Sequence, residues 1–366
     1  MPDLDANPKY RSAAPGSAGE RLASLDGLRA VSIALVCLSH LYASKAIPGL
    51  GFLWRFQLGD LGVRIFFVIS GFLITHLLIT EQQRTGTVSL KNFFIRRVLR
   101  IFPAYYALLA FVAVCAQLGY LQVTAGEWLK AALYVSNYFD RPQALAHSWS
   151  LSVEEQFYIL WPLLILALRT RRAIALAAAF ALLVAAIRAA HSFPIAPETN
   201  VFWVRFETAG DAIAIGCVFA ALRHRLWTFA AYRAFTTPAG TLAASVAVAA
   251  LATSHHWPWF WNSIGITLMN VCIVLILDGC MRARGHWHFT LLNSVPVVTL
   301  GGLSYSLYLW QQLFLTSVWK VPFPLSLLLA VAAGAASYYL LERPVARLKD
   351  TYFSKQKPRR TAGSPT

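Results

Sequence analysis

The sequence predicts an all-α membrane protein, a polytopic bundle of about ten transmembrane helices. Of its 366 residues, 57% are hydrophobic and only 13% are charged, and the mean hydropathy is +0.54. This composition supplies too little polar surface for a soluble globule of this size. The apolar residues also lie in runs of about 17 to 25 residues, the length that a helix needs to cross a bilayer.

Ten such runs follow one another along the chain. They cover residues 26–44, 60–80, 103–120, 149–168, 173–190, 207–222, 235–252, 259–281, 297–318 and 324–341. Because ten is an even number, both ends of the chain are expected on the same side of the membrane.

The positions of lysine and arginine predict the orientation, because cytosolic segments of membrane proteins are enriched in both. With the N-terminus in the cytosol, the inner segments hold 23 of the 32 basic residues and the outer segments hold 7, with Arg188 counted among these. Arg29 and Arg64 lie within spans. The net charge of +16 is therefore explained mostly by topology, and no nucleic-acid motif or partner is indicated.

The segments outside the spans are polar. Residues 1–24 are rich in Ala, Pro, Ser and Gly and are expected to be a disordered cytosolic segment, residues 25–348 the transmembrane domain, and residues 349–366 a basic cytosolic tail. All five cysteines fall in apolar runs without metal-binding or disulfide spacing. We therefore expect no disulfide and no metal.

The first span carries an arginine and a histidine on an apolar helix, LDGLRAVSIALVCLSH. Arg29 and His40 are eleven residues apart, almost three whole turns, which places them on one face about 16 Å apart. Ionisable residues inside membrane helices are costly and tend to mark a functional site. Arg29 alone is also consistent with a side chain that extends to the lipid headgroups.

Polar residues from several spans are predicted to lie at one depth in the outer half of the membrane. Helix direction places six residues there: His40, Arg64, Glu154, Asp211, Gln311 and Gln312. A shared layer favours one site, and hydrogen bonding between helices is the alternative for the two glutamines.

The fourth span begins with SLSVEEQFY, in which Ser150, Glu154 and Tyr158 are spaced four apart and form one polar stripe. A buried carboxylate needs a partner or a proton. His40 is the expected partner of Glu154, since a carboxylate orients an imidazole. A structural ion pair with Arg64 is the alternative.

A cluster of arginines precedes the third span. Arg96, Arg97 and Arg100 occur at three- and four-residue spacing in RRVLRIFP, just before Pro103. Such a cluster is consistent with anchoring to anionic lipids. It equally suits a polyphosphate, because arginine binds phosphate through two hydrogen bonds.

Several of these stretches together resemble the acyltransferase-3 family of bacterial integral-membrane O-acyltransferases. The matching stretches are LDGLRAVSIALVCLSH, LGVRIFFVISGFLIT, IRRVLRIFP, SLSVEEQFY, LGGLSYSLYLWQQ and LLERPVARL, and they run from Leu25 to about Leu348. Two positions differ from the usual pattern: many relatives have an acid where Arg64 stands, and often a histidine where Gln311 stands. The extracytoplasmic esterase-like domain of some relatives is expected to be absent.

The resemblance implies an enzyme of the bacterial inner membrane that uses acyl-CoA, most simply acetyl-CoA, as donor. His40 would be the essential histidine with Arg29 beside it, Arg97 and Arg100 would bind the donor, and Glu154 would lie in or near the site. The acceptor would be a hydroxyl of a glycan or glycolipid, such as a surface polysaccharide, lipopolysaccharide or exopolysaccharide.

The residues and the resemblance together predict direct transfer. The donor phosphates would bind the cytosolic arginines, and His40, oriented by Glu154, would act as general base. Ser150, Tyr158, Asp211, Gln311 and Arg64 would surround the acceptor. Three alternatives remain: an acyl-enzyme relay through Ser150, a transporter or lipid-binding membrane protein, and a structural partner of a glycan assembly complex.

Overall fold

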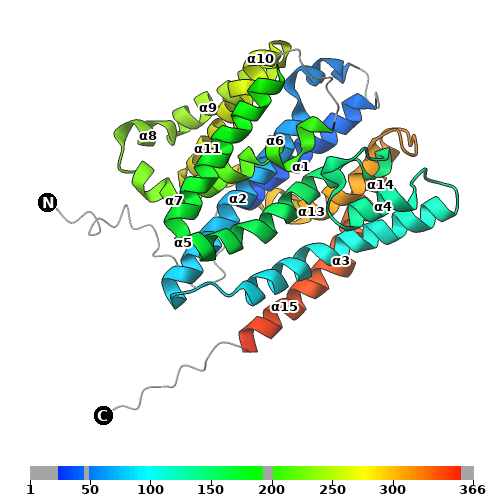
Figure 1. Cartoon of the computed structure of the whole chain (residues 1–366). Helices are drawn as coiled ribbons and strands as arrows, with labels where there is room; N and C mark the ends of the chain where they lie inside the picture. The colour runs from blue at the N-terminus through cyan, green and yellow to red at the C-terminus, as the bar shows by residue number, and fades with distance from the viewer. Residues whose placement is uncertain (1–23, 45–48, 193–200, 356–366) are drawn as a thin grey trace.

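The computed structural model describes residues 24–44, 49–192 and 201–355, and within these ranges the chain is helical without a strand (Figure 1). The predicted segments 1–24 and 349–366 lie largely outside the described residues. The longer helices are α1 (Leu25–Ala43), α2 (Leu58–Thr85), α3 (Leu90–Gln117), α5 (Ser148–His191), α7 (Asp211–Leu226), α9 (Pro238–Thr253), α11 (Ile266–Arg282), α13 (Val295–Leu315), α14 (Leu325–Ser337) and α15 (Arg343–Lys355).

Short helices connect these elements. They are the 3-10 helices η2 (Leu50–Phe56), η3 (Ser136–Tyr138), η4 (Gln143–Leu145), η5 (Phe202–Val204) and η6 (Ser254–His256), the short α-helices α4 (Ala125–Ala132), α6 (Phe206–Ala209), α8 (Ala230–Phe235), α10 (Pro258–Phe260) and α12 (Trp287–Leu292), and the π-helical turns η7 (Trp261–Gly265) and η8 (Tyr338–Glu342).

Every apolar run of the sequence falls on helix, but the count of ten membrane spans is not confirmed. Six helical stretches of the described chain are long and apolar enough to cross a membrane. They are Leu25–Ala43, Gly51–Thr85, Leu90–Gln117, Ser148–His191, Pro258–Arg282 and Leu325–Leu348. The predicted fourth and fifth spans together form α5. This helix is broken at Arg169, whose backbone is not helical (φ 62°, ψ 151°).

The start of the third span differs from the prediction. Helix α3 begins at Leu90, with the Ser89 hydroxyl accepting a hydrogen bond from the Asn92 amide as its N-cap. Pro103 therefore lies inside the helix instead of opening it. The arginine cluster is consequently part of the same rigid helix as the apolar stretch.

Helices α2 and α7 pack closely against each other, because small residues let their backbones approach. A Cβ on Gly71 would lie 1.9 Å from the Ile213 carbonyl oxygen, and one on Gly216 would lie 2.3 Å from that of Val68. Helix α1 packs on α2 and α13, and α13 packs in turn on α14. Helix α5 packs on α7 and contacts α2, and the hydrogen bond between Ser150 and Tyr308 joins it to α13.

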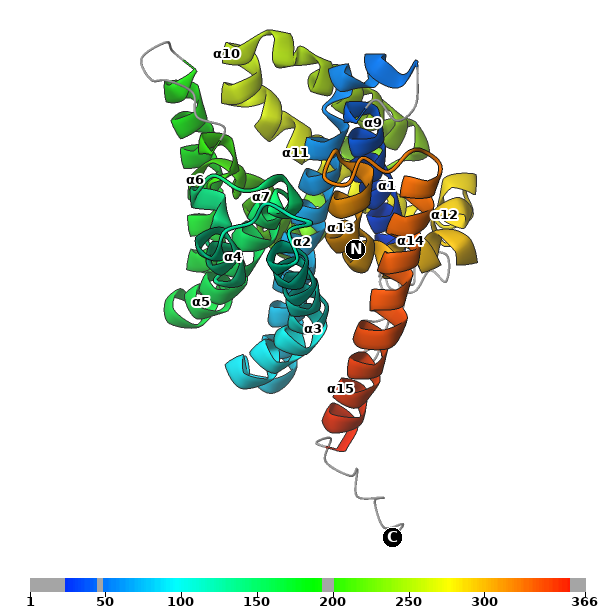
Figure 2. The same ribbon diagram turned by 90° about the vertical axis from the view of Figure 1, so that its right-hand side faces the viewer.

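The two ends of the bundle are distinct. In Figure 2 the start of α3 and the helix α15 extend at one end, while η2 and α10 lie at the opposite end. At the C-terminal end of α11, the buried carboxylate of Asp278 forms ion pairs with Arg282 at 2.8 Å and with Arg223 at 3.5 Å. It also accepts a hydrogen bond from Tyr232 at 2.9 Å, which ties α8 to α11.

Candidate functional site

A polar stripe on α5 faces a serine of α2. The Ser70 hydroxyl donates to Oε1 of Glu154 at 2.5 Å and lies 2.8 Å from the Tyr158 hydroxyl. Glu154 and Ser70 are half-buried, and Tyr158 is buried. The predicted stripe of α5 is therefore confirmed for these two residues, and Ser70 is its partner.

Two arginines of the predicted cluster lie near the Tyr158 end of this stripe. The guanidinium of Arg97 lies 3.7 Å from the centre of the Tyr158 ring, a cation–π contact. Arg100 is exposed and interacts electrostatically with Arg29, Arg97, Tyr158 and Glu342. Neither Arg97 nor Arg100 forms an ion pair or hydrogen bond with the described part of the chain.

The third arginine of the cluster faces elsewhere. Arg96 pairs with Glu81 of α2 at 3.4 Å, and its side chain is 41% exposed. Its side chain thus points away from Tyr158, because neighbouring residues such as Arg96 and Arg97 project about 100° apart around a helix. The predicted grouping of Arg96 with Arg97 and Arg100 is not observed.

Arg29, on α1, acts together with Arg97 and Arg100. Its Nη1 lies 3.0 Å from Oδ1 of Asp26 within the first turns of the helix. Its charge also acts on Arg100 and on Glu154. Arg29, Arg97 and Arg100 therefore form one cationic group, in which Arg29 pairs with Asp26 and on which the charges of Glu154 and Glu342 also act.

His40 lies at the other end of α1, in its last turn, and is half-buried. Another histidine, His147, lies directly before α5. Ser150 donates its hydroxyl to the His147 carbonyl at 3.1 Å and is also hydrogen-bonded to the Tyr308 hydroxyl. Thus His147, Ser150 and Tyr308 form a second polar group.

The expected pairing of Glu154 with His40 is not observed among the described residues. Glu154 instead accepts a hydrogen bond from Ser70, and the charges that act on it are those of Arg97, Arg29 and Arg100. The physical reason is register, because α5 runs opposite to α1 and Glu154 comes two turns after the level of His147. Glu154 also does not pair with Arg64.

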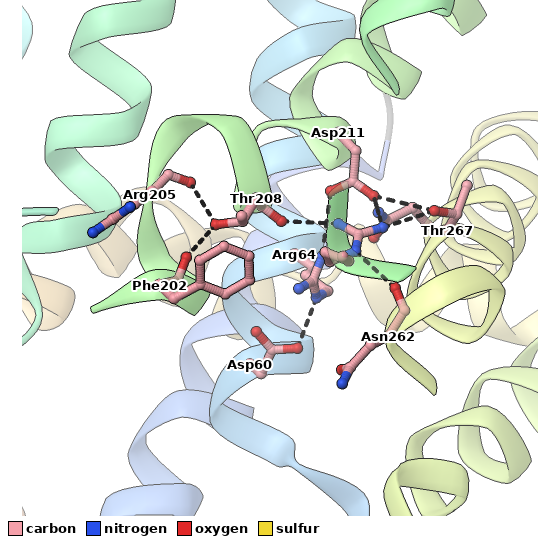
Figure 3. A network of polar contacts seen from close by, with 10 residues as sticks. Asp60, Arg64, Phe202, Arg205, Thr208, Asp211, Asn262 and Thr267 are labelled. Carbon is pink, nitrogen blue, oxygen red and sulfur yellow. Dashed lines mark hydrogen bonds and ion pairs between the residues drawn. The ribbon is translucent and has the colours of Figure 1, made fainter. Parts of the chain in front are cut away.

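Arg64 and Asp211 belong to a separate network, shown in Figure 3. Arg64 donates to Asp60 at 2.7 Å and lies 3.6 Å from Oδ1 of Asp211. The fully buried Arg188 donates to Oδ2 of Asp211 at 2.8 Å and to the Thr208 and Asn262 carbonyls. Asn270 also donates to this carboxylate, at 3.0 Å.

This network corrects three predictions. Asp211 is fully buried and occupied by protein partners, so it does not face an acceptor. Arg64 balances Asp60 and Asp211 rather than Glu154. Arg188, counted as an outer-loop cation, lies inside α5 at 0% exposure. The predicted single polar layer therefore divides between two different regions of the bundle.

The glutamines of α13 are buried. Gln312 donates to the Gln143 carbonyl at 2.8 Å and so attaches α13 to η4. Gln311 makes only a long contact of 3.5 Å to the Tyr308 carbonyl, and its Oε1 has no partner among the described residues. Gln312 thus fits the alternative of a hydrogen bond between helices, while Gln311 lies one turn from Tyr308.

Sequence reasoning missed Ser70, His147, Tyr308 and Glu342. Each lies inside or beside a stretch already singled out: Ser70 in VISGF, His147 before SWSLSVEEQFY, Tyr308 in SLYLW and Glu342 in LLERP. The surrounding motifs were recognised, but no regular spacing in the sequence marks a single hydroxyl or a histidine at the end of a span as part of a site. Only the packing of α1, α2, α5 and α13 shows which of these residues meet.

The fold and the site define a helical membrane protein with a cationic group at one end of a buried polar stripe and a histidine at the other. The family model described as an acyltransferase domain matches residues 22–341. The chain belongs to this family, the acyltransferase-3 family that its motifs resemble.

Similar proteins are peptidoglycan and other O-acetyltransferases. The chain is 27% identical over 322 residues to the peptidoglycan O-acetyltransferase OatA of Listeria monocytogenes, covering 80% of this chain and 49% of that protein. It is 25% identical to the putative peptidoglycan O-acetyltransferase YrhL of Bacillus subtilis (88% and 54% covered). It is 27% identical to the O-acetyltransferase OatA of Staphylococcus aureus (88% and 57% covered).

The chain spans about half the length of these curated relatives. No solved structure is matched.

Proposed function

We propose that this protein is a membrane O-acyltransferase that moves an acyl group, most simply acetyl, from acyl-CoA to a hydroxyl of a glycan. The observation that carries the proposal is the pair Arg97 and Arg100. These guanidiniums lie beside Arg29 and make no ion pair within the described chain, whereas Arg64, Arg96, Arg188, Arg223 and Arg282 each have a carboxylate partner.

Like charges brought together without partners favour an anionic ligand, and arginine is well suited to phosphate. Coenzyme A carries its phosphates at one end and its thioester at the far end of a long flexible arm. With the phosphates on Arg97 and Arg100, the arm would extend along the stripe of Tyr158 and Glu154. This direction leads toward His40, about 16 Å from the level of Arg29 along α1.

His40 would act as general base at the far end. It would take the proton from the acceptor hydroxyl while the hydroxyl oxygen attacks the thioester carbonyl. The tetrahedral intermediate would then collapse with cleavage of the C–S bond. His40 would pass the proton that it took from the acceptor to the departing thiolate of CoA. This step balances without an oxidant, a metal or a covalent enzyme intermediate, and general base catalysis contributes typically about 10² to 10⁴ in rate.

The bonding of Ser150 supports direct transfer over a relay. A serine nucleophile needs a base to receive its proton. The Ser150 hydroxyl instead donates to the His147 carbonyl and bonds the Tyr308 hydroxyl. Both partners hold it as a structural group.

For the acceptor we propose peptidoglycan or a related cell-envelope glycan, with the acceptor reaching His40 from outside the cytosol. The names of the relatives from Listeria and Bacillus support this acceptor class. The basic residues at the α3 and α15 end support a cytosolic location for that end and for both termini, since positive residues prefer the cytosolic face.

The proposal is tested with the full chain purified into nanodiscs. Acetyl-CoA is added with and without a soluble peptidoglycan fragment, and free CoA thiol and acetylated glycan are measured. We expect both products to appear together and to depend on the fragment. A protein that binds acetyl-CoA and releases no thiol with any glycan of the envelope would contradict the proposal and favour a transporter or binding protein.

A further inference from the structure

Two buried polar side chains near the Tyr158 end of the stripe have no role in the steps above. Glu155 of α5 is 9% exposed, and Tyr134, just before η3, is 8% exposed. The Tyr134 hydroxyl has no hydrogen-bond partner among the described residues, and Glu155 forms no hydrogen bond or ion pair with them. Buried polar groups without a partner are rare in folded proteins, and a buried carboxylate is especially costly. Both groups therefore need an explanation.

Glu155 projects into the angle between η3 and α3. On α5 it lies three residues after Ser152 and three before Tyr158, so these two residues flank it at about 60° on either side around the helix. The Ser152 hydroxyl contacts that of Ser136 in η3 at 2.9 Å. On the other flank, the Tyr158 ring contacts the guanidinium of Arg97 on α3 at 3.7 Å. The side chain of Glu155 is therefore directed between these two elements.

Tyr134 borders the same space. Its carbonyl accepts a hydrogen bond from Gln156 of α5 at 2.9 Å. Its ring stacks on two rings of α3, Tyr105 with centroids 4.7 Å apart and Phe102 with centroids 5.8 Å apart. Its φ of 54° is in the left-handed region, which is costly for a residue other than glycine and is found most often at functional sites. Tyr134 is thus held between α5 and α3, and its hydroxyl is left unused.

The space between Glu155 and Tyr134 adjoins the proposed phosphate site. From the contact of Arg97 with Tyr158, one turn of α5 toward its start leads to Glu155. Two turns of α3 in the direction of increasing residue number lead to Tyr105 and so to the Tyr134 ring. Both directions lead to Tyr134, because Tyr134 contacts α3 and α5 together. The arm of a donor whose phosphates lie on Arg97 would therefore meet Glu155 first and Tyr134 next.

We propose that Glu155 and Tyr134 bind the amide groups of the pantetheine arm of acyl-CoA. This inference rests on the proposed function. Between its phosphates and its thioester the arm carries two amides, each with an N–H donor and a carbonyl acceptor. Glu155 accepts a hydrogen bond from an amide N–H, and the Tyr134 hydroxyl donates to an amide carbonyl. Each buried group gains in the donor complex the partner that it lacks within the chain.

The test compares the binding of two ligands to the full chain in nanodiscs. Acetyl-CoA carries the phosphates and the arm, whereas adenosine 3′,5′-bisphosphate carries phosphates alone. Tyr134→Phe removes only the hydroxyl and should weaken acetyl-CoA binding by about 3- to 10-fold, the range for one neutral hydrogen bond. Glu155→Met should weaken it by about 10-fold or more, because hydrogen bonds to a charged group are stronger. The Kd of the bisphosphate should stay unchanged in both variants.

Tyr105→Phe is the matched control. Tyr105 stacks on the Tyr134 ring, but its hydroxyl donates to the Ala131 carbonyl at 2.9 Å. This variant should lower the thermal midpoint and change neither Kd. Tyr134→Phe should instead keep or raise the midpoint of the ligand-free protein, because the hydroxyl that it removes is buried without a partner.

The outcomes separate this inference from the proposed function. An unchanged acetyl-CoA Kd in either variant, or an equal loss of affinity for both ligands, would overturn the role of Glu155 and Tyr134 and leave the proposed function standing. A fall in the midpoint of Tyr134→Phe as large as that of Tyr105→Phe would also overturn it, since it would assign the hydroxyl to a structural water. A wild-type protein that binds neither ligand would instead contradict the proposed function.

Discussion

The guanidinium of Arg97 on α3 lies 3.7 Å from the centre of the Tyr158 ring on α5. This contact joins the arginine cluster to the polar stripe of α5, and through Ser70 it connects to Glu154. A residue on α3 is thereby placed at one end of a line of polar groups that leads toward His40.

The first prediction concerns donor binding. Arg97→Gln and Arg100→Gln should each weaken acyl-CoA binding by about 10- to 150-fold, because a hydrogen bond to a charged group contributes about 1.5 to 3 kcal/mol. Arg96→Gln is the matched control, since Arg96 pairs with Glu81 on another face. The measurement is acyl-CoA Kd by calorimetry in nanodiscs. Equal effects at all three positions would indicate a general surface-charge effect instead of a donor site.

The second prediction concerns Glu154, which lies among Arg29, Arg97 and Arg100 rather than beside His40. Glu154→Gln removes a negative charge from this group and keeps an acceptor for Ser70. An anionic donor should therefore bind as well as before or more tightly, and the transfer rate should fall much less than in His40→Ala.

The check is acyl-CoA Kd together with single-turnover transfer. A rate loss as deep as that of His40→Ala, with donor binding unchanged, would make Glu154 the partner of His40 after all.

The sequence was a good guide to helices and a poorer guide to which polar residues meet. Apolar run length located a helix at every predicted span, and four-residue spacing located the Glu154 and Tyr158 stripe. The predicted pairing of Glu154 with His40 was wrong because the depth of each side chain was judged from the ends of the predicted spans. A difference of two helical turns along α5 places Glu154 near the arginines instead of near His40.

The Asp211 network could not be inferred for another reason. Arg188 looked like a loop residue because it lies near the end of an apolar run, yet α5 continues to His191 and buries it. Asp211, Arg64 and Arg188 come from three helices whose adjacency depends on the close contact of α2 with α7. Nothing in the local sequence of any one of them specifies the other two.

The third prediction follows from this network. Asp211→Asn leaves Arg188 buried without a counter-charge, which costs about 3 to 5 kcal/mol for a broken buried pair. The thermal midpoint in detergent should fall clearly, while the folded fraction should retain its acyl-CoA affinity. Asp140→Asn is the control, because Asp140 is exposed. Loss of acceptor use at unchanged stability would return Asp211 to the binding site.

The fourth prediction concerns sidedness. A cysteine or reporter placed within residues 84–91 should be accessible from the cytosol, and one within residues 123–143 from the outside. The reason is that lysine and arginine are concentrated in the segments predicted to be cytosolic, which include residues 84–91. Labelling of intact cells with a membrane-impermeant thiol reagent makes the measurement. Labelling of residues 84–91 from outside would place the arginine cluster on the wrong side for a cytosolic donor.

The most direct test of the account is His40→Ala, assayed for transfer and for acyl-CoA binding in the same preparation. Because His40 and the cationic group lie at opposite ends of the stripe, transfer should fall by about 10² to 10⁴ while the acyl-CoA Kd stays at its wild-type value. A His40→Ala protein that turns over at a near-normal rate would contradict the general-base role, and one that loses acyl-CoA binding along with transfer would place His40 in donor recognition.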